Sequence, residues 1–201
     1  MGLFDRKNDS DAPATSGQVS PDLAALTGDY TIDPAHSVIG FTARHAMVTN
    51  VKGSFNEFEG TLHLDGSDPS SSTASLDVNL DSIDTGSADR DGHLKSGDFF
   101  ETEKYPAMTF RSTRAEARGG DDYRITGDLT IRDITKEISI DLEFNGSATD
   151  PFGNERVGFE GKSEILRSDW GISWNAALET GGVLVSDKIK LTFDISAIKN
   201  A

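Results

Sequence analysis

Apolar and polar residues alternate along most of the chain beyond residue 28. A period of two places the apolar side chains on one face of a β-strand, whereas a helix needs spacings of three and four. The alternation predicts a short strand at 29–32 and another strand around Met108 and Phe110. The other expected strands lie at 37–44, 51–64, 73–81, 123–131, 138–144, 157–165 and 189–195.

Turns rich in Gly, Pro, Asp and Asn separate these strands. Sequential hairpins with one polar face per strand are typical of an antiparallel sheet. We therefore predict an all-β protein in which eight long strands close into an antiparallel up-and-down barrel, because closure removes exposed edges; a two-layer sandwich is the alternative. Within 51–64 the apolar parity changes between Phe55 and Phe58, which predicts a β-bulge near Asn56.

The stretch 84–106 shows no alternation, although strands are predicted on both sides of it. Connections longer than about 12–15 residues usually carry function or local structure. Ser87 is suited to cap a short helix over 88–96. The adjacent aromatic residues Phe99 and Phe100 need an apolar environment. We therefore predict a short helical insertion that closes one mouth of the barrel.

The first 27 residues differ from the rest of the chain, because 1–19 are polar and mixed in charge. They are predicted to form a disordered tail. Ser20 and Pro21 are suited to begin a short helix at 20–27, which is stable only if it docks on the barrel. Residues 28–201 are then the barrel, with no second domain.

The chain carries 34 acidic and 19 basic residues, a formal net charge of −15, and it has no cysteine. This charge repels nucleic acids and anionic headgroups, so neither is an expected partner. Without cysteine there is no disulfide, thiol nucleophile or thiolate metal site. No stretch approaches the roughly 18 apolar residues of a membrane span, and the N-terminus lacks the apolar core of a signal peptide. We expect a cytoplasmic protein without stable membrane insertion.

The predicted barrel is tall, because strands of about eleven residues at about 3.3 Å each span roughly 36 Å. Its inward rows consist mainly of Ile, Leu, Val and Phe, interrupted by small residues such as Ala74, Gly127 and Gly161. A narrow apolar interior of this height suits a long alkyl or prenyl chain. The alternation is equally compatible with a solid barrel, because a filled core and a lined cavity have the same pattern.

Candidate chemistry is sparse. Asp33, His36 and Ser37 are close in sequence, but a catalytic triad is defined by geometry, and in this turn Asp33 is expected to cap backbone amides. We predict no catalytic residue and no metal site, since no two histidines have the close spacing of metal ligands. His45 follows an inward row near a strand end, where it could meet a polar head or make a hydrogen bond at the barrel mouth.

Two further groups have alternative roles. Arg90, Asp91 and His93 either bind a headgroup or pin the insertion through ion pairs and hydrogen bonds, and we prefer the structural role. Trp170 and Trp174 either close the other end of the barrel, stack on a ligand or form a dimer contact, and we prefer closure.

A series of motifs follows in order between residues 28 and 199. They are Tyr30 to Phe41, Arg44-His45, Val51 to Phe55, Arg90 to Leu94, Asp98 to Phe100, Tyr105-Pro106, Gly127 to Ile131, Arg167 to Gly171 and Val185 to Asp187. Together they resemble the YceI-like family, bacterial barrels of the extended lipocalin type. Asp133 departs from the pattern, because the family usually has glycine in the tight turn after Arg132; this affects the turn and not the fold.

The resemblance implies an eight-stranded barrel that binds, carries or stores a polyisoprenoid or similar long-chain amphiphile, such as an isoprenoid quinone, and that often forms a homodimer. It implies no chemistry and no cofactor other than the bound lipid. The alternatives are an enzyme that acts on an isoprenoid lipid and a filled-barrel interaction module of a stress response.

The residues expected to contact the ligand are inward-facing strand residues, together with His45, residues of the insertion at 84–106, and Trp170. They are Ile39, Phe41, His45, Leu76, Val78, Leu80, Arg90, His93, Phe99, Phe100, Met108, Phe110, Leu129, Ile140, Leu142, Phe159, Trp170, Leu191 and Phe193.

Overall fold

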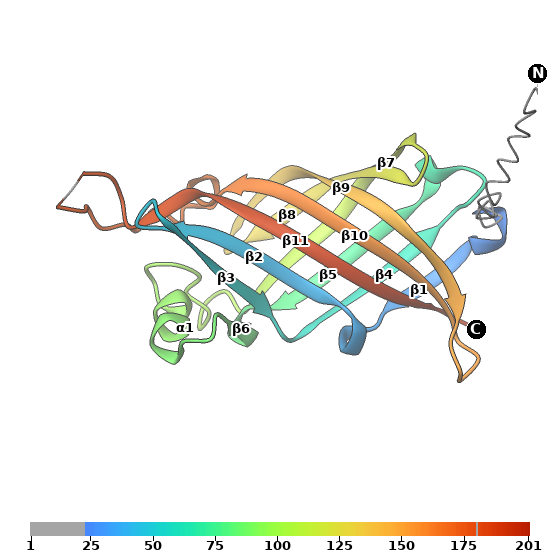
Figure 1. Ribbon diagram of the computed structural model, residues 1–201, viewed down its shortest axis with the longest axis horizontal. Helices are drawn as coiled ribbons and strands as arrows, with labels where there is room; N and C mark the ends of the chain where they lie inside the picture. The colour runs from blue at the N-terminus through green and yellow to red at the C-terminus, as the bar shows by residue number, and fades with distance from the viewer. Residues whose placement is uncertain (1–22, 180) are drawn as a thin grey trace, which may run out of the picture.

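The computed structural model describes residues 23–179 and 181–201. Its strands form one closed antiparallel β-barrel with eight strand positions, which Figure 1 shows as elongated. The barrel closes through its last strand, β11 (Val185–Lys199), which pairs with both β1 (Gly28–Ile32) and β2 (Val38–His45). The predicted fold class is confirmed. Of the predicted tail, residues 1–22 lie outside the described residues.

Three of the eight positions are each occupied by two successive strands. These pairs are β1 with β2, β3 (Thr49–Phe55) with β4 (Phe58–Leu64), and β5 (Thr73–Asn79) with β6 (Ile83–Asp84). The turns η2 (Pro34–His36) and η4 (Leu80–Ser82) interrupt the first and third positions. Each of these three positions is therefore divided between two strands, whereas the other five are each formed by one strand.

The β-bulge predicted near Asn56 is wrong. β3 pairs with β2 and β6, whereas β4 pairs with β1 and β5, so one strand ends at Phe55 and a new one begins at Phe58. The Asn56 amide donates a hydrogen bond to the Ser82 carbonyl oxygen (3.2 Å), outside the strand pairing. The apolar parity changes because the chain bends between two strands.

The other strands are long and follow one another as antiparallel hairpins. They are β7 (Ala107–Gly119), β8 (Asp122–Ile131), β9 (Ile134–Thr149) and β10 (Glu155–Leu166), which leads to β11. In β8, Ile125 and Leu129 are buried while Asp128 is exposed. The period-two pattern thus identifies the inward face correctly.

One end of the barrel is covered by the insertion between β6 and β7. Its helix, α1 (Ala88–Lys95), begins after Ser87, although the Ser87 side chain makes no capping hydrogen bond. The 3-10 helix η5 (Arg167–Trp170) covers the same end. Phe99 and Trp170 are buried there in the main hydrophobic core. The predicted helical insertion is confirmed.

The opposite end carries the short 3-10 helices η1 (Leu23–Leu26) and η3 (Pro69–Ser71). In Figure 1, α1 lies at one end of the long axis and the blue start of the described chain lies at the other. A second hydrophobic cluster includes Tyr30 and Phe144, and Leu23 and Leu26 pack against it only partly buried. The two ends are therefore closed by different means.

Candidate ligand-binding cavity

The barrel contains a cavity of about 180 Å³ that is not fully enclosed. The cavity begins under η1, where Leu23 and Leu26 line it, and extends inward to Leu129. The Leu129 carbonyl oxygen accepts a hydrogen bond from Trp170 Nε1 (3.1 Å), so the buried Trp170 ring lies next to the inner end of the cavity. The interior is solid at the α1 end and hollow toward η1. The sequence left open a solid barrel and a barrel with a lined cavity, and each describes part of the structure.

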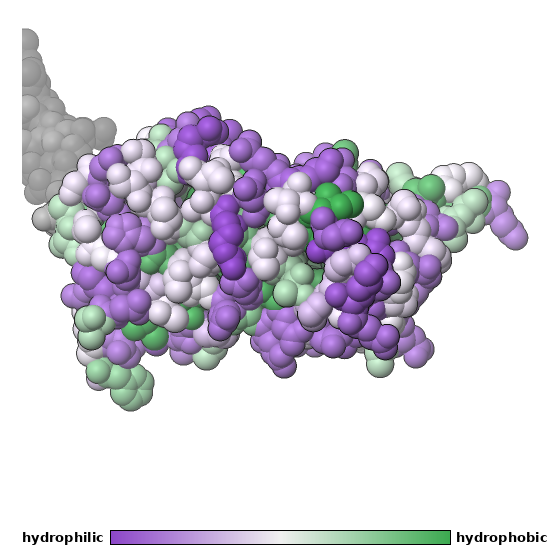
Figure 2. Space-filling model, turned by 180° about the vertical axis from the view of Figure 1, so that it is seen from behind, coloured by the Kyte–Doolittle hydropathy of each residue, from purple (hydrophilic) through white to green (hydrophobic). Residues whose placement is uncertain are grey.

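The wall of the cavity is almost wholly apolar, because the inward positions of the strands carry mainly Ile, Leu, Val, Phe and Met. Two charged residues belong to the wall, but their charged groups are bound elsewhere. Asp65 Oδ1 accepts hydrogen bonds from the backbone amides of Ser67 and Asp68, and Arg124 binds Asp141. The outer surface in Figure 2 is mainly polar. A guest inside therefore meets hydrocarbon and almost no charge.

Most strand residues predicted to contact a ligand belong to the cavity wall. They are Ile39, Leu76, Val78, Met108, Phe110, Leu129, Ile140, Leu142, Phe159, Leu191 and Phe193. They come from both halves of the chain and meet because the barrel closes. Their contact with a ligand stays a prediction.

The other predicted apolar residues lie outside the cavity wall, in the solid part of the barrel. Leu80, Phe99 and Trp170 are buried in the main core, and Phe41 and Phe100 pack against that core. Phe100 is within 6.1 Å of a core aromatic ring, measured between ring centroids. These side chains fill the α1 end, which gives Phe99 and Phe100 the apolar environment that they were expected to need. The prediction that the two tryptophans close the other end of the barrel is wrong, because Trp170 shares the core with Phe99 and Trp174 packs on the Phe99 ring (5.4 Å between ring centroids).

The three polar residues on the predicted list also lie away from the cavity wall. His45 is exposed at the end of β2. Arg90 donates to Thr85 Oγ1 (2.7 Å) and to the Thr85 carbonyl oxygen (2.8 Å). His93 Nε2 lies 2.8 Å from Asp98 Oδ2. The contacts of Arg90 and His93 hold the insertion together, and a headgroup contact for any of the three stays a prediction.

Arg132 ties the α1 end together. It lies in the tight turn between β8 and β9 with a φ of +57°. Its guanidinium donates to the carbonyl oxygens of Gly97 (3.0 Å) and Gly171 (3.2 Å) and lies 3.3 Å from the Glu101 carboxylate. One side chain thus joins the turn, the insertion and the end of η5.

Sequence reasoning missed part of the cavity wall. Several omitted residues share the inward face that the alternation had already indicated: Ile32, Phe55, Leu62, Ile125, Phe144 and Ile195. Leu23 and Leu26 were missed for a different reason, because they lie in the segment predicted as a tail. Their spacing of three, just after Ser20 and Pro21, was the available signal.

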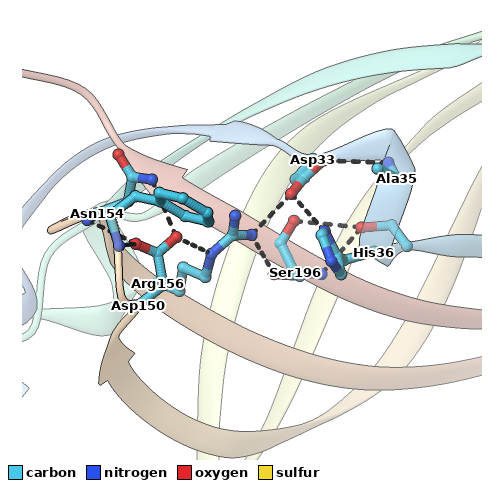
Figure 3. Close-up of polar contacts among 9 residues, drawn as sticks. Asp33, Ala35, His36, Asp150, Asn154, Arg156 and Ser196 are labelled. Atoms are coloured by element: carbon cyan, nitrogen blue, oxygen red, sulfur yellow. Dashed lines mark hydrogen bonds and ion pairs between the residues drawn. The ribbon is translucent and has the colours of Figure 1, made fainter.

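A polar network lies outside the barrel near the junction of β1 and β2 (Figure 3). Arg156 donates to Asp33 Oδ2 (2.7 Å) and to Asp150 Oδ2 (2.8 Å). Asp33 also accepts a hydrogen bond from the Ala35 amide (3.0 Å), and its Oδ2 lies 2.8 Å from His36 Nδ1. The hydrogen bonds from Arg156 and His36 hold the pKa of Asp33 below its ordinary value. The predicted capping role of Asp33 is confirmed.

Ser37 is bound elsewhere, so no triad forms. Its Oγ donates to the Ser196 carbonyl oxygen (3.2 Å) and accepts from the Ser196 amide (2.9 Å). Across residues 23–179 and 181–201, no group of three or more His, Asp or Glu side chains is placed to hold a metal ion. The network joins η2 to β10 and β11 and is not directed into the cavity.

Acid is expected to weaken the fold through this network. Hydrogen bonds from Asn154 and Arg156 lower the pKa of Asp150 strongly, and that of Asp33 is also lowered. Folded-state values below the ordinary 3.8 mean that this stabilisation is present above pH 3.8 and is lost as the pH falls through the folded-state values. We expect Arg156→Met to unfold at lower urea concentration at pH 7 and to show a flatter loss of stability between about pH 5 and pH 2.

Urea unfolding at a series of pH values measures this prediction. Arg111→Met is the matched control, because Arg111 pairs with Asp77 on the exposed surface, where ion pairs contribute little. The control should keep the acid dependence of the unaltered protein. An equal acid dependence in Arg156→Met would contradict the assigned role.

The fold and the cavity together define a class of protein, the antiparallel up-and-down β-barrels with an apolar interior cavity. Within this class, the chain belongs to the YceI-like domain family, whose model matches residues 30–197. The matched range covers nearly the whole barrel. η1 precedes it.

Bacterial relatives are similar over most of the chain. A UPF0312 protein of Staphylococcus aureus strain N315 is 40% identical over 170 residues, which cover 84% of this chain and 95% of the relative. Protein YceI of Escherichia coli O17:K52:H18 is 38% identical over 151 residues, which cover 74% of this chain and 78% of the relative.

Solved structures show the same fold. The YceI protein of Campylobacter jejuni is 30% identical, with a TM-score of 0.69, and the match covers 79% of this chain and 90% of that one. BcnA of Burkholderia cenocepacia is 22% identical with a TM-score of 0.73, covering 82% and 98%. A polyisoprenoid binding domain of Saccharophagus degradans is 17% identical with a TM-score of 0.63, covering 85% and 98%. In the described part of this chain, no helix has the length and apolar character needed to cross a membrane.

Proposed function

We propose that this protein binds, carries or stores a long-chain polyisoprenoid or a similar amphiphilic lipid inside the barrel, without catalysing a reaction on it. The observation that carries the proposal is the cavity inside the barrel, whose wall is contributed by both halves of the chain and is almost free of polar groups. Such a wall binds by the hydrophobic effect, which is non-directional and scales with the apolar area removed from water.

The energetics favour a long guest. Each methylene moved from water into an apolar interior contributes about 0.8 kcal/mol. Ten carbons therefore contribute about 8 kcal/mol, which is comparable with the roughly 4–15 kcal/mol cost of association. A wall without directed polar groups adds little to this sum, so tight binding needs a chain longer than about two isoprene units.

The similarity to a polyisoprenoid binding domain supports the same class of guest. That domain shares the fold at 17% identity, so the support rests on shared architecture. The apolar cavity wall of this chain adds support at the level of the binding site, which shared architecture alone does not give. An isoprenoid quinone or a prenyl phosphate are the chemical types that we propose.

Catalysis on such a lipid has less support. The histidines His45 and His93 and the cation Arg90 lie outside the cavity wall, and Arg90 and His93 are used to hold the insertion. A general acid or base must come within hydrogen-bond reach of the group it acts on. The residues of the cavity wall thus favour binding over catalysis.

We further propose that the protein acts as a homodimer in the cytoplasm.

Lipid extraction tests the proposal. Protein purified without detergent is analysed by native mass spectrometry, and its organic extract is then analysed for lipids. We expect an adduct whose mass matches an extracted long-chain isoprenoid. Delipidated protein should take the same lipid back from phosphatidylcholine vesicles. Protein that neither retains nor extracts any long-chain lipid would refute the proposal.

A control separates binding in the cavity from adhesion to the surface. A short isoprenoid alcohol such as geraniol, with ten carbons, should bind far more weakly than a prenyl alcohol of forty carbons, because the gain grows with the number of buried carbons. Equal affinity for both would show that the cavity is not the binding site.

A further inference from the structure

We infer that η1 is the movable end wall of the cavity and that the hydrocarbon chain of the guest enters beneath it. The inference rests on the proposed function and adds the route by which the site is filled. Leu23 and Leu26 both line the cavity, so the apolar face of η1 forms part of its surface. Displacing η1, Leu23–Leu26, would therefore widen access to the interior at this end.

η1 lies against the barrel without being buried in it. None of its residues is buried, and Leu23 and Leu26 are only half-buried. Tyr30 Oη donates to the Leu26 carbonyl oxygen (2.8 Å), and Lys199 Nζ donates to that of Ala25 (3.1 Å). A segment with little buried apolar area and solvated hydrogen bonds opens at small cost in free energy. η1 therefore has the properties of a movable element.

The link between η1 and the barrel contains a natural hinge. Gly28, the first residue of β1, has a φ of +152°, a conformation that residues with a side chain rarely adopt. A rotation at Gly28, which pairs with Leu64, would move η1 and leave the pairing of β1 from Asp29 onward intact. The hinge thus lies between the movable segment and the fixed wall.

The backbone of η1 packs directly against Gly66. The backbone of Leu23 approaches Gly66 so closely that a Cβ atom there would overlap the Leu23 carbonyl oxygen. The Gly66 amide also donates to Thr27 Oγ1 (3.1 Å). The backbone of Gly66 is outside the left-handed region, so alanine is compatible with its conformation. In Gly66→Ala either η1 or the turn that carries residue 66 must therefore shift, and we expect η1 to move because none of its residues is buried.

The α1 end is less suited to opening. Arg132 joins three segments there, and the main core fills the space beneath them.

A second alternative route is the seam between β9 and β10, the line along which these two strands pair. Their pairing ends at Asp141 and Lys162, and beyond it Ser163 Oγ donates to the Ser139 carbonyl oxygen (2.7 Å).

The cavity is small for the proposed guest. Pockets for drug-sized ligands usually measure about 300–1,000 Å³. The cavity of about 180 Å³ is smaller than these, although the proposed guest is longer than most drugs. A long chain therefore needs additional space, and the space beneath η1 is continuous with the cavity because Leu23 and Leu26 line it.

Thiol labelling tests the route without any lipid, because the chain has no cysteine of its own. Val78 is 1% exposed and belongs to the cavity wall, so Val78→Cys is a reporter of access to the interior. We expect N-ethylmaleimide to modify this reporter at least about tenfold faster in Gly66→Ala than in the reporter protein alone. Leu26→Asp, which removes the apolar contact and keeps Gly66, should accelerate labelling in the same way.

Controls identify the route. Gly97→Ala is the matched substitution at the α1 end, because a Cβ there meets no atom within 4 Å, and it should leave labelling unchanged. Ser163→Ala loosens the seam and should also have no effect. Ile83→Cys, buried in the core and not part of the cavity wall, reports global unfolding and should stay unreactive in Gly66→Ala.

The outcomes separate the route from the proposed function. Faster labelling of the Val78→Cys reporter in Ser163→Ala but not in Gly66→Ala would overturn the inference and place access at the seam. Equal acceleration at Val78→Cys and Ile83→Cys would also overturn it, because the whole barrel would then be opening. Selective acceleration at Val78→Cys supports the inference even if no variant extracts a forty-carbon prenyl alcohol from phosphatidylcholine vesicles, a result that would refute the proposed function alone.

Discussion

Filling the cavity should abolish lipid retention while the protein stays folded. Ala115 lines the cavity on β7 and is buried, so the ring of Ala115→Phe would occupy space that the guest needs. We expect the lipid recovered per protein to fall at least about tenfold, a change of about 1.4 kcal/mol or more in binding free energy. The thermal midpoint should stay the same or rise, because an apolar side chain that fills a cavity is commonly stabilising.

Native mass spectrometry and thermal unfolding measure the two effects in the same samples. Glu116→Phe is the matched control, since Glu116 is the next residue of β7, on its opposite face, and its contact with Arg114 is an exposed ion pair. The control should retain lipid as the unaltered protein does. Full lipid retention in a stably folded Ala115→Phe variant would show that the guest lies elsewhere.

The barrel itself is readable from the sequence because one physical rule decides it. Inward positions alternate with outward ones, and Ile125, Leu129 and Ile140 are buried as this rule predicts. The breaks within three of the strand positions are not readable in this way. At Asn56 the chain bends because β3 and β4 take different partners, and those partners lie far away in the sequence.

Whether the interior is hollow cannot be read from the alternation. Leu80 and Leu142 have the same chemistry and the same place in the alternating sequence pattern, yet Leu80 lies in solid core and Leu142 in the cavity wall. The difference arises from what covers each end of the barrel. Trp170 enters the interior from η5, whereas η1 only rests on the other end.

The contribution of η1 to the cavity wall shows a second limit of prediction from the sequence. The spacing of Leu23 and Leu26 indicates a short helix but gives no partner for it. The partner is Gly66, some forty residues further along the chain, and its contribution is the absence of a side chain. A missing Cβ leaves no hydrophobic or polar signal, so this contact becomes visible only when the backbones are placed together.

Removing the Trp170 ring should unfold the protein far more readily than any change at the cavity mouth. The ring is 2% exposed, and its Nε1 donates to the Leu129 carbonyl oxygen. Replacing a buried tryptophan by alanine costs about 3–5 kcal/mol, because contacts are lost and a cavity remains. Trp174→Ala is the comparison, since Trp174 is only half-buried, packed on the rings of His93 and Phe99, and should cost clearly less.

Urea unfolding followed by far-UV circular dichroism compares these variants without relying on tryptophan fluorescence. Trp170→Phe provides a folded alternative if the alanine variant does not fold, and should cost about 1–3 kcal/mol because the buried Leu129 carbonyl oxygen loses its donor. The phenylalanine variant should still retain lipid, since the ring lies outside the cavity wall. A Trp170→Phe protein of full stability that has lost its lipid would reverse the assignment and make Trp170 a ligand contact, as the sequence had predicted.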